Sequence, residues 1–278
     1  MSKLKTFFRS LYLSATNPSY YRDLLKTKFS FSLKYFFGLS LLLTLISTIV
    51  FSLILIPQIK TLEQTLKTQA DTFYPNDLVI TLKNGKLSTN RKDPIVVTFP
   101  FDTGENRKNL VIDPTASISA MEKYQAGVLI NEDSLSLIGE NNQIRTYPLS
   151  DIENFTLNKS EFSKGVAMVE KFLDALPAFL PGILLVIFVF SISIGLFLKI
   201  LFYSLLTYAV ARVQNLHITY GKAFQLTIHA ITPIVLLQIL EIVFGIQIPI
   251  PLFFQILYVI LLVIIIKEIK NKLGEAKK

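Results

Sequence analysis

The hydrophobic positions of this chain gather into four long blocks separated by polar stretches. The first block, Leu33–Ile56, is 24 residues long and carries one charge, Lys34, at its start. A helix of that length runs about 36 Å, enough to cross a bilayer with some tilt. Three more apolar blocks follow, at residues 177–198, 223–244 and 251–266. The pattern predicts four transmembrane helices, of which the last is short at 16 residues.

Two positions in this pattern need separate interpretation. Residues 200–211 stay apolar for only 12 residues, which is too short for another crossing. They either continue the second span or form a helix at the inner interface. Pro233 lies in the middle of the third span, where a proline is expected to kink the helix.

Residues 57–176, between the first two spans, have a different texture. An apolar stripe with helical spacing predicts that the first span extends to about Ala70. At the far end, Asn158 and Glu161 form a capping box. This box opens a helix over residues 159–176 that returns the chain to the membrane.

Short runs of alternating residues, separated by turn residues, occupy residues 73–157. This texture predicts a mainly β domain, α+β when its flanking helices are included. Asn84-Gly85 is a strong signal for the turn of its first hairpin. The expected strands lie at residues 77–82, 86–89, 95–99, 110–112, 127–130, 135–138 and 144–147. An antiparallel arrangement is expected for most of them.

Basic residues are distributed unevenly. The segments 1–34, 199–222 and 267–278 hold 15 of the 28 Lys and Arg but only 3 of the 20 Asp and Glu, whereas residues 57–176 hold 13 basic and 16 acidic residues. By the positive-inside rule the basic segments are cytoplasmic, with both termini inside, and residues 57–176 form an extracytoplasmic domain. The protein is thus expected in the cell membrane. Its first span is expected to be an uncleaved signal anchor, because the apolar run is longer than that of a cleavable signal peptide.

Residues 1–32 form a basic amphipathic segment before the first span. An apolar helical face is flanked by Lys3, Lys5 and Arg9, and its members are Leu4, Phe7, Phe8, Leu11 and Tyr12. Such a helix is expected to lie on the inner leaflet, with Phe7 and Phe8 in lipid and the basic residues near anionic head groups. The alternative is that it packs against cytoplasmic parts of the same protein.

Composition argues against several function classes. The chain has no Cys, which excludes disulfides and Cys-ligated metals. The net charge of +8 comes from the cytoplasmic segments and lacks a basic–aromatic groove pattern, so nucleic-acid binding is not expected. Acidic residues of the outer domain fall at strand ends and turns, where Asp is ordinary. We therefore expect no enzyme activity, no cofactor and no metal.

Five polar residues of the third span are candidates for chemistry in the membrane: Gln225, His229, Thr232, Gln238 and Glu241. The first three share a helix face near the inner side, and the last two lie on a roughly opposite face near the outer side. Ionisable groups in a span indicate function by default. However, a neutral histidine bonded to a neighbouring helix and a glutamate reaching interfacial water explain the pattern equally well. Two local contacts are predicted, each worth no more than about 1 kcal/mol.

Six stretches resemble a known family in style and order. They are FFRSLY (Phe7–Tyr12), DLVITLKNGKLS (Asp77–Ser88), NLVIDPT (Asn109–Thr115), GVLINEDSLSL (Gly127–Leu137), YPLSDIENFTLNKSEF (Tyr147–Phe162) and YGKAFQLTIHAITP (Tyr220–Pro233). Together they resemble a bacterial integral-membrane family of unknown function, sometimes labelled maltodextrin-utilisation protein. The last stretch is also similar to the Yip-type membrane domain. The resemblance implies no reaction and no binding residues.

Three functions remain open. The preferred one is a non-enzymatic, membrane-anchored accessory or scaffold protein whose outer domain binds a protein or a cell-envelope component. The second is a small transporter or permease subunit with a polar path through spans two to four, although the inverted halves of many transporters are absent. The third is an envelope sensor that relays binding in the outer domain to the basic inner segments.

Overall fold

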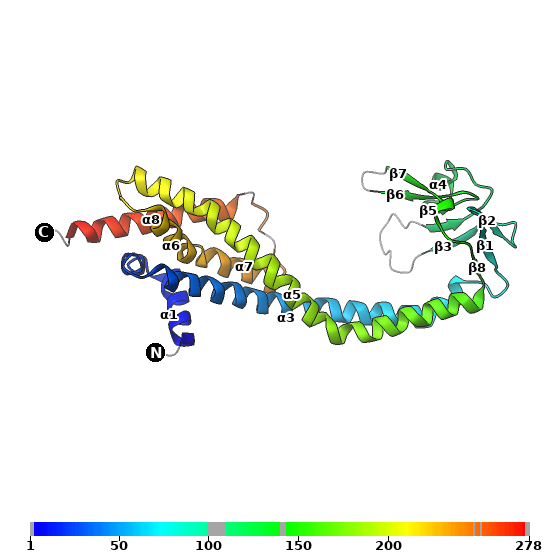
Figure 1. The fold of residues 1–278 in the computed structure, drawn as a ribbon, viewed down its shortest axis with the longest axis horizontal. Coiled ribbons are helices and arrows are strands. Elements are labelled where there is room, and N and C mark those ends of the chain that lie inside the picture. The colour runs from blue at the N-terminus through cyan, green and yellow to red at the C-terminus, as the bar shows by residue number, and fades with distance from the viewer. Residues whose placement is uncertain (1–2, 99–108, 140–142, 247, 251, 276–278) are drawn as a thin grey trace. The chain divides into compact units, whose positions relative to one another are not determined.

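A computed structural model describes residues 3–98, 109–139, 143–246, 248–250 and 252–275. The fold is a mixed α+β fold in which two sheets lie, along the sequence, between long helices (Figure 1). The chain divides into two compact units. Unit 1 comprises Met1–Leu55 and Phe179–Lys278, and unit 2 comprises Ile56–Ala178.

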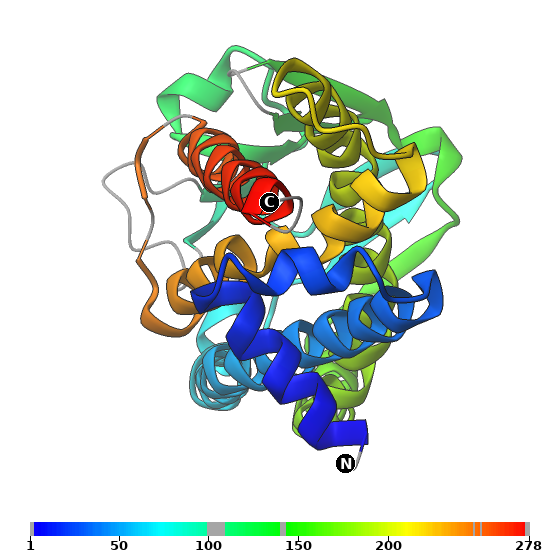
Figure 2. The same ribbon diagram turned by 90° about the vertical axis from the view of Figure 1, so that its left-hand side faces the viewer.

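Unit 1 is helical, and the first and last helices of the described chain, α1 and α8, belong to it (Figure 2). Its elements are α1 (Lys3–Thr16), α2 (Tyr20–Leu24), the first part of α3 (Phe29–Phe73), the second part of α5 (Lys159–Val213), α6 (Tyr220–Ala230), α7 (Thr232–Phe244) and α8 (Phe253–Glu275). Helix α6 contacts α1, α2, α7 and α8. Every residue of α6 from Gln225 to Ala230 is buried, as expected for a helix enclosed by protein on all sides.

Three helices of the described chain are long and apolar enough to cross a membrane. They are Phe29–Ala70 in α3, Lys159–Val213, which is α5, and Tyr220–Phe244, which combines α6 and α7. The first span and its expected extension form one helix with Pro57 inside it. Residues 200–211 belong to the uninterrupted helix α5, so of the two interpretations of that run, continuation of the second span is correct.

The third span consists of two helices that meet at Ile231. Helix α6 ends at Ala230, α7 begins at Thr232, and Pro233 lies in the first turn of α7. A proline is tolerated there because the first N–H groups of a helix have no intrahelical partner. The proline therefore marks the start of a new helix. At the other end of α7, Gly245 adopts φ 64° and terminates the helix in a left-handed conformation.

Unit 2 contains two sheets. The three-stranded sheet has the order β2-β1-β8 and consists of β1 (Ile80–Lys83), β2 (Lys86–Thr89) and β8 (Phe155–Leu157). The five-stranded sheet has the order β3-β4-β5-β6-β7 and consists of β3 (Ile95–Thr98), β4 (Asn109–Ile112), β5 (Ala126–Ile130), β6 (Ser134–Ile138) and β7 (Ile144–Pro148). The short helices α4 (Ala120–Lys123) and η2 (Leu149–Asp151) lie in the connections.

Local sequence signals explain two of these elements. Asn84 and Gly85 both have positive φ, 55° and 72°, which is the conformation of a two-residue hairpin turn between twisted strands. The Glu161 N–H donates to the Asn158 side-chain oxygen at 3.0 Å, so the Asn158 half of the expected capping box opens helix α5, while the Glu161 carboxylate accepts from Lys164. The first expected strand is shorter than predicted and begins at Ile80.

One strand and one strand pairing were not predicted from the sequence. Strand β8 closes the smaller sheet by pairing with β1, with Thr81 opposite Thr156. Strands β4 and β5 pair in parallel, with Val111 opposite Leu129. The other strand pairs are antiparallel, as expected. A parallel pair needs a crossover connection, and here the segment containing α4 supplies it.

Two separate cores hold unit 2. One core joins the two sheets through apolar residues that include Leu82 and Leu87 from the smaller sheet and Ile95 and Ile112 from the larger. The second core lies where α4 packs on the larger sheet, around Val111. Both faces of the larger sheet therefore carry buried residues.

Candidate functional site

His229 on α6 is fully buried and contacts α1, α2 and α3. Its Nδ1 lies 3.2 Å from the Ser14 hydroxyl and 3.2 Å from the Tyr20 hydroxyl, and its Nε2 lies 3.1 Å from the Ser32 hydroxyl. A neutral imidazole offers one donor and one acceptor nitrogen, and a hydroxyl can take either role. These three hydroxyls therefore satisfy both ring nitrogens of a neutral histidine.

Aromatic rings lie nearly parallel to the imidazole of His229. The Tyr35 ring is 4.1 Å away between centroids at an interplanar angle of 14°, and the Phe31 ring is 5.8 Å away at 8°. The Tyr35 hydroxyl also shares a 2.7 Å hydrogen bond with the Thr232 hydroxyl. Tyr35 thus links two residues that the sequence analysis placed on one face.

Gln225 holds the turn between α2 and α3 against α6. Its Nε2 donates to the Thr27 hydroxyl at 2.7 Å and lies 3.3 Å from the Leu24 carbonyl oxygen. Its Oε1 accepts from Lys222 Nζ at 3.0 Å, and the same ammonium donates to the Thr27 carbonyl at 2.9 Å. Carbonyls at the end of a helix lack intrahelical partners. Gln225 therefore supplies a partner to the last residue of α2, and Lys222 supplies one to Thr27 in the turn that follows.

Gln238 and Glu241 make contacts of their own. Lys199 Nζ donates to Gln238 Oε1 at 3.4 Å, which joins α5 to α7. Glu241 Oε1 accepts from the Ile248 N–H at 3.1 Å, in the segment after α7. Tyr35 joins His229 and Thr232. Gln238 and Glu241 are bonded to other parts of the chain.

A second set of buried hydroxyls, from α5, α6 and α8, was missed. Thr207 Oγ1 lies 2.7 Å from Thr227 Oγ1 and 2.7 Å from the Tyr258 hydroxyl, and the Tyr203 ring stacks on Tyr258 at 4.3 Å. Hydroxyls inside apolar helices were the available signal, because a lipid environment offers them no partner. The hydroxyl partners of His229 were also missed, since the sequence does not show which N-terminal residues reach α6.

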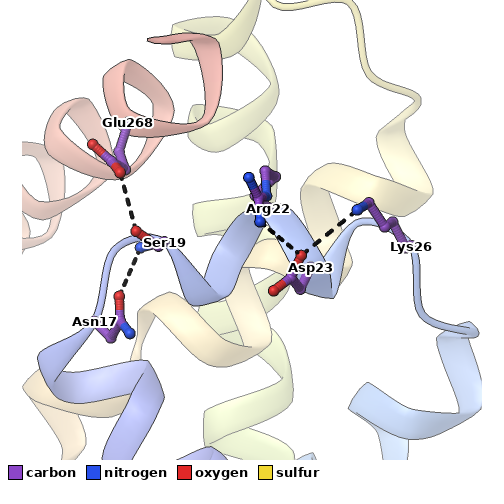
Figure 3. A network of polar contacts seen from close by, with 6 residues as sticks. All are labelled: Asn17, Ser19, Arg22, Asp23, Lys26 and Glu268. Carbon is purple, nitrogen blue, oxygen red and sulfur yellow. Dashed lines mark hydrogen bonds and ion pairs between the residues drawn. The ribbon is translucent and has the colours of Figure 1, made fainter. Parts of the chain in front are cut away.

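The turn between α1 and α2 is fastened to α8. The Ser19 N–H donates to Asn17 Oδ1 at 3.0 Å, and the Ser19 hydroxyl donates to Glu268 Oε1 at 3.0 Å (Figure 3). Asp23 pairs with neighbouring basic residues of its own segment (Figure 3), and such exposed pairs contribute little to stability.

Burial raises the pKa of the Tyr20 phenol, which keeps the hydroxyl facing His229 neutral.

The apolar face predicted for helix α1 is only partly directed away from the protein. Phe7 and Leu11 pack against the core of unit 1, and Ser10 and Ser14 are buried with them, whereas Phe8 is 49% exposed. The face is divided because the small polar residues turn inward toward α6 and α7. Only part of the expected apolar face is therefore available to lipid.

Phe7 is held in place by α3. Its ring lies 5.5 Å from that of Tyr35, and a Cβ at Gly38 would come within 2.7 Å of the Phe7 ring. Glycine is needed at position 38 for this approach. Phe7 therefore packs against the same protein, but against α3 residues that the sequence placed in the first span and not against the cytoplasmic parts named in the second interpretation.

The cluster around His229 in unit 1 offers hydrogen-bonding groups and few side chains that could ligate a metal. Among the described residues, no three His, Cys, Asp or Glu side chains gather as they would around a metal ion. His229 is surrounded by serine and tyrosine hydroxyls instead. This arrangement positions the N-terminal helices.

Unit 2 contains a partly open cavity of about 300 Å³. Helices α3 and α5 contribute Leu66, Phe73, Phe162 and Val166, and strands β1, β3, β4 and β8 contribute further aliphatic side chains. The lining hydroxyl, on Tyr74, donates to the Leu157 carbonyl at 2.6 Å. The cavity therefore presents an almost purely apolar wall. No sequence signal indicated it, because its lining residues read as ordinary core positions.

One cation lies beside the cavity wall. Lys159 Nζ donates to the Tyr74 carbonyl oxygen at 3.1 Å and stands 5.9 Å from the centre of the Phe162 ring. Tyr74 and Phe162, which stack on each other at 4.8 Å, both line the cavity. Burial raises the pKa of the Tyr74 phenol, so the lining hydroxyl is neutral.

Comparison with known proteins finds one match. The model of the family described as "Protein of unknown function (DUF1189)" matches residues 8–269. Comparison with curated proteins and with solved structures finds no match. The comparisons give no support to the maltodextrin-utilisation label or to the Yip-type similarity. Since the match covers nearly the whole sequence, the chain belongs to the DUF1189 family, whose function is unknown.

Proposed function

We propose that the protein is a non-enzymatic membrane accessory protein whose unit 2 binds a component of the cell envelope. The observation that carries the proposal is the contrast between the two interiors. The polar candidates in unit 1 are bonded to neighbouring elements, whereas unit 2 has an open apolar cavity. Ligand sites are usually concave and mostly apolar, so unit 2 is the better candidate for binding.

The proposal includes a topology with four spans. Helix α8 supplies the fourth, both termini are cytoplasmic, and unit 2 is extracytoplasmic. The excess of Lys and Arg in the segments 1–34, 199–222 and 267–278 supports this arrangement. Reporter fusions after Thr89, Asn215 and Lys278 are expected to report outside, inside and inside. A C-terminal fusion that reports outside would contradict the topology.

The proposal also places α1 at the inner leaflet. Its exposed side carries Leu4 and Phe8, which are 66% and 49% exposed, beside the exposed Lys3, Lys5 and Arg9. Apolar and basic side chains on one exposed side are what an interfacial helix presents to anionic lipid. Phe7 faces the protein and has no part in this contact.

Photo-cross-linking in living cells tests the binding role. A photoreactive residue at Ile144 or Tyr147, both 48% exposed on edge strand β7, is expected to capture a defined envelope component. The control position is Ile49, which is 58% exposed in the apolar part of α3. If the positions on β7 capture nothing beyond what Ile49 captures, unit 2 has no binding role.

A sensor is the second candidate, and one observation favours it. Helices α3 and α5 each run without interruption from unit 2 into unit 1, so each of them carries both cavity-wall residues and part of an apolar segment. Transport is tested by solute or proton flux in proteoliposomes. Flux in the wild type that both His229→Ala and Glu241→Gln abolish at normal protein level would replace the accessory role with a transport role.

A further inference from the structure

We infer that the cavity of unit 2 binds the acyl chain of an anionic lipid. The inference rests on the proposed binding role of unit 2 and names its ligand class.

The apolar wall of the cavity favours a hydrocarbon ligand over water. A water molecule in a cavity needs two to four polar partners, and the hydroxyl of Tyr74 is already bonded to the Leu157 carbonyl. The cavity volume of about 300 Å³ is about twice that of an engineered apolar cavity of roughly 150 Å³ that stays dry and binds benzene. A flexible hydrocarbon chain satisfies such a wall because it needs no hydrogen bond.

The surroundings of the cavity favour an anionic head group. The cavity is only partly enclosed, so a bound chain can keep its polar end in water. The ammonium of Lys159 lies beside two wall residues, Tyr74 and Phe162. A carboxylate or phosphate at the end of a chain bound against Tyr74 and Phe162 would meet the positive charge of Lys159.

The helices of the wall explain why a lipid is the ligand. Leu66 and Phe73 belong to α3, and Phe162 and Val166 belong to α5. Both helices also contain an apolar segment long enough to cross a membrane. A protein held in a bilayer is surrounded by acyl chains. A free fatty acid and an anionic phospholipid share the two features that this site would recognise, an acyl chain and an anionic head group.

The test uses the full chain in phosphatidylcholine nanodiscs. The first arm adds palmitic acid that carries a diazirine within its chain. The second arm builds the same photoreactive chain into phosphatidylglycerol in the nanodisc. After illumination, labelled peptides are mapped by mass spectrometry, and peptides of the apolar spans serve as the internal reference because they contact lipid in every sample.

The variants fill the cavity or a neighbouring exposed position. Val97 and Val166 line the cavity, so Val97→Phe and Val166→Phe place a ring inside it. The matched controls are Val96→Phe on the same strand and Val169→Phe on the same helix, at positions that are 47% and 46% exposed. If one filling variant fails to fold, the other decides.

In the wild type we expect label in the cavity-wall peptides in at least one of the two arms. The arm that gives the label shows whether the bound lipid is a free fatty acid or a phospholipid. Each filling variant is expected to lower the yield about tenfold, while each control stays within about twofold. Lys159→Gln is expected to lower the yield by a smaller factor. Unlabelled wall peptides in both arms, or equal label in the filling variants, would overturn the inference. If β7 still captures an envelope component in that case, only the ligand class is wrong.

Discussion

The interior of unit 1 contains hydrogen-bonded polar side chains, whereas the cavity in unit 2 is lined by apolar ones. In unit 1, Gln225, His229 and Thr232 are buried and bonded to residues of the N-terminal helices, whereas the space between the sheets and helices of unit 2 is walled by hydrocarbon. Bonded polar groups fix one arrangement of helices, because each alternative leaves a buried donor or acceptor unpaired. An apolar cavity fixes little and leaves room for a ligand. The polar side chains of unit 1 thus hold its helices together, and this contrast is the basis for proposing that unit 2 binds a ligand.

The largest effect is expected at His229, which is fully buried in unit 1. His229→Ala removes a ring that stacks on Tyr35 and contacts three hydroxyls. We expect a loss of about 2–4 kcal/mol in the free energy of unfolding, from a new cavity and unpaired hydroxyls. This exceeds the limit of about 1 kcal/mol set from the sequence, which counted one hydrogen bond and no ring packing.

The matched control is the other histidine. His217 is exposed and has Arg212 beside it, so His217→Ala is expected to change stability by less than about 0.5 kcal/mol. Unfolding of both variants in nanodiscs by denaturant gives the comparison. Equal losses in the two variants would show that the cluster around His229 does not hold unit 1 together.

The next effect separates a filled core from a cavity within unit 2. Val111 is fully buried beneath α4, whereas Val97 lines the cavity. Val111→Phe overpacks the core and is expected to cost about 1–3 kcal/mol, while Val97→Phe is expected to be neutral or to stabilise by about 0.5–2 kcal/mol. Thermal unfolding of unit 2 within the full chain measures both. A loss of similar size in both variants would mean that no space is available at Val97.

A smaller effect concerns the cap on α2. Gln225→Leu removes the donor to the Thr27 hydroxyl and is expected to cost about 1–2 kcal/mol. The turn is also expected to become more sensitive to trypsin at Lys26 and Lys28. Gln238→Leu, which loses only a 3.4 Å contact with Lys199, is the control. If trypsin cleaves both variants at equal rates, Gln225 does not hold the turn.

The smallest effect lies on the surface of unit 2. A hydrogen bond from Arg91 lowers the pKa of Asp77, so the ionised form stabilises the folded state. This contribution is present above the unfolded pKa of about 3.9 and is lost as the pH falls through the lower folded value. Hydrogen exchange of the β1–β2 hairpin at pH 3 and pH 7 measures it. Asp77→Asn and Arg91→Gln are each expected to reduce the pH dependence, and a dependence unchanged in both variants would contradict the assignment.

Local signals predicted the elements of this fold better than their pairing. Asn84-Gly85 and Asn158 gave the hairpin and the start of α5 because the backbone conformation they require depends on adjacent residues. The parallel pairing of β4 with β5 escaped prediction, since a crossover depends on what lies on the face of the sheet. The number of spans and the side of unit 2 remain proposals from the charge distribution.

The candidate sites show the same division. His229 and Gln225 were predictable as polar residues on one face of an apolar helix. Their partners, such as Ser14 and Thr27, were not, because they lie about 200 positions away in the sequence. The cavity of unit 2 has no sequence signature, since lining residues such as Val97 and Val166 are apolar like those of the core around them.

Hydrogen exchange of the full chain in nanodiscs, with and without decanoate as a soluble acyl probe, tests the central claim most directly. The account predicts protection in peptides that contain the cavity residues Val97 and Val166, loss of that protection in Val166→Phe, and no change over the α6 residues around His229. Protection over α6 with none at the cavity wall would place the ligand in unit 1 and contradict the account.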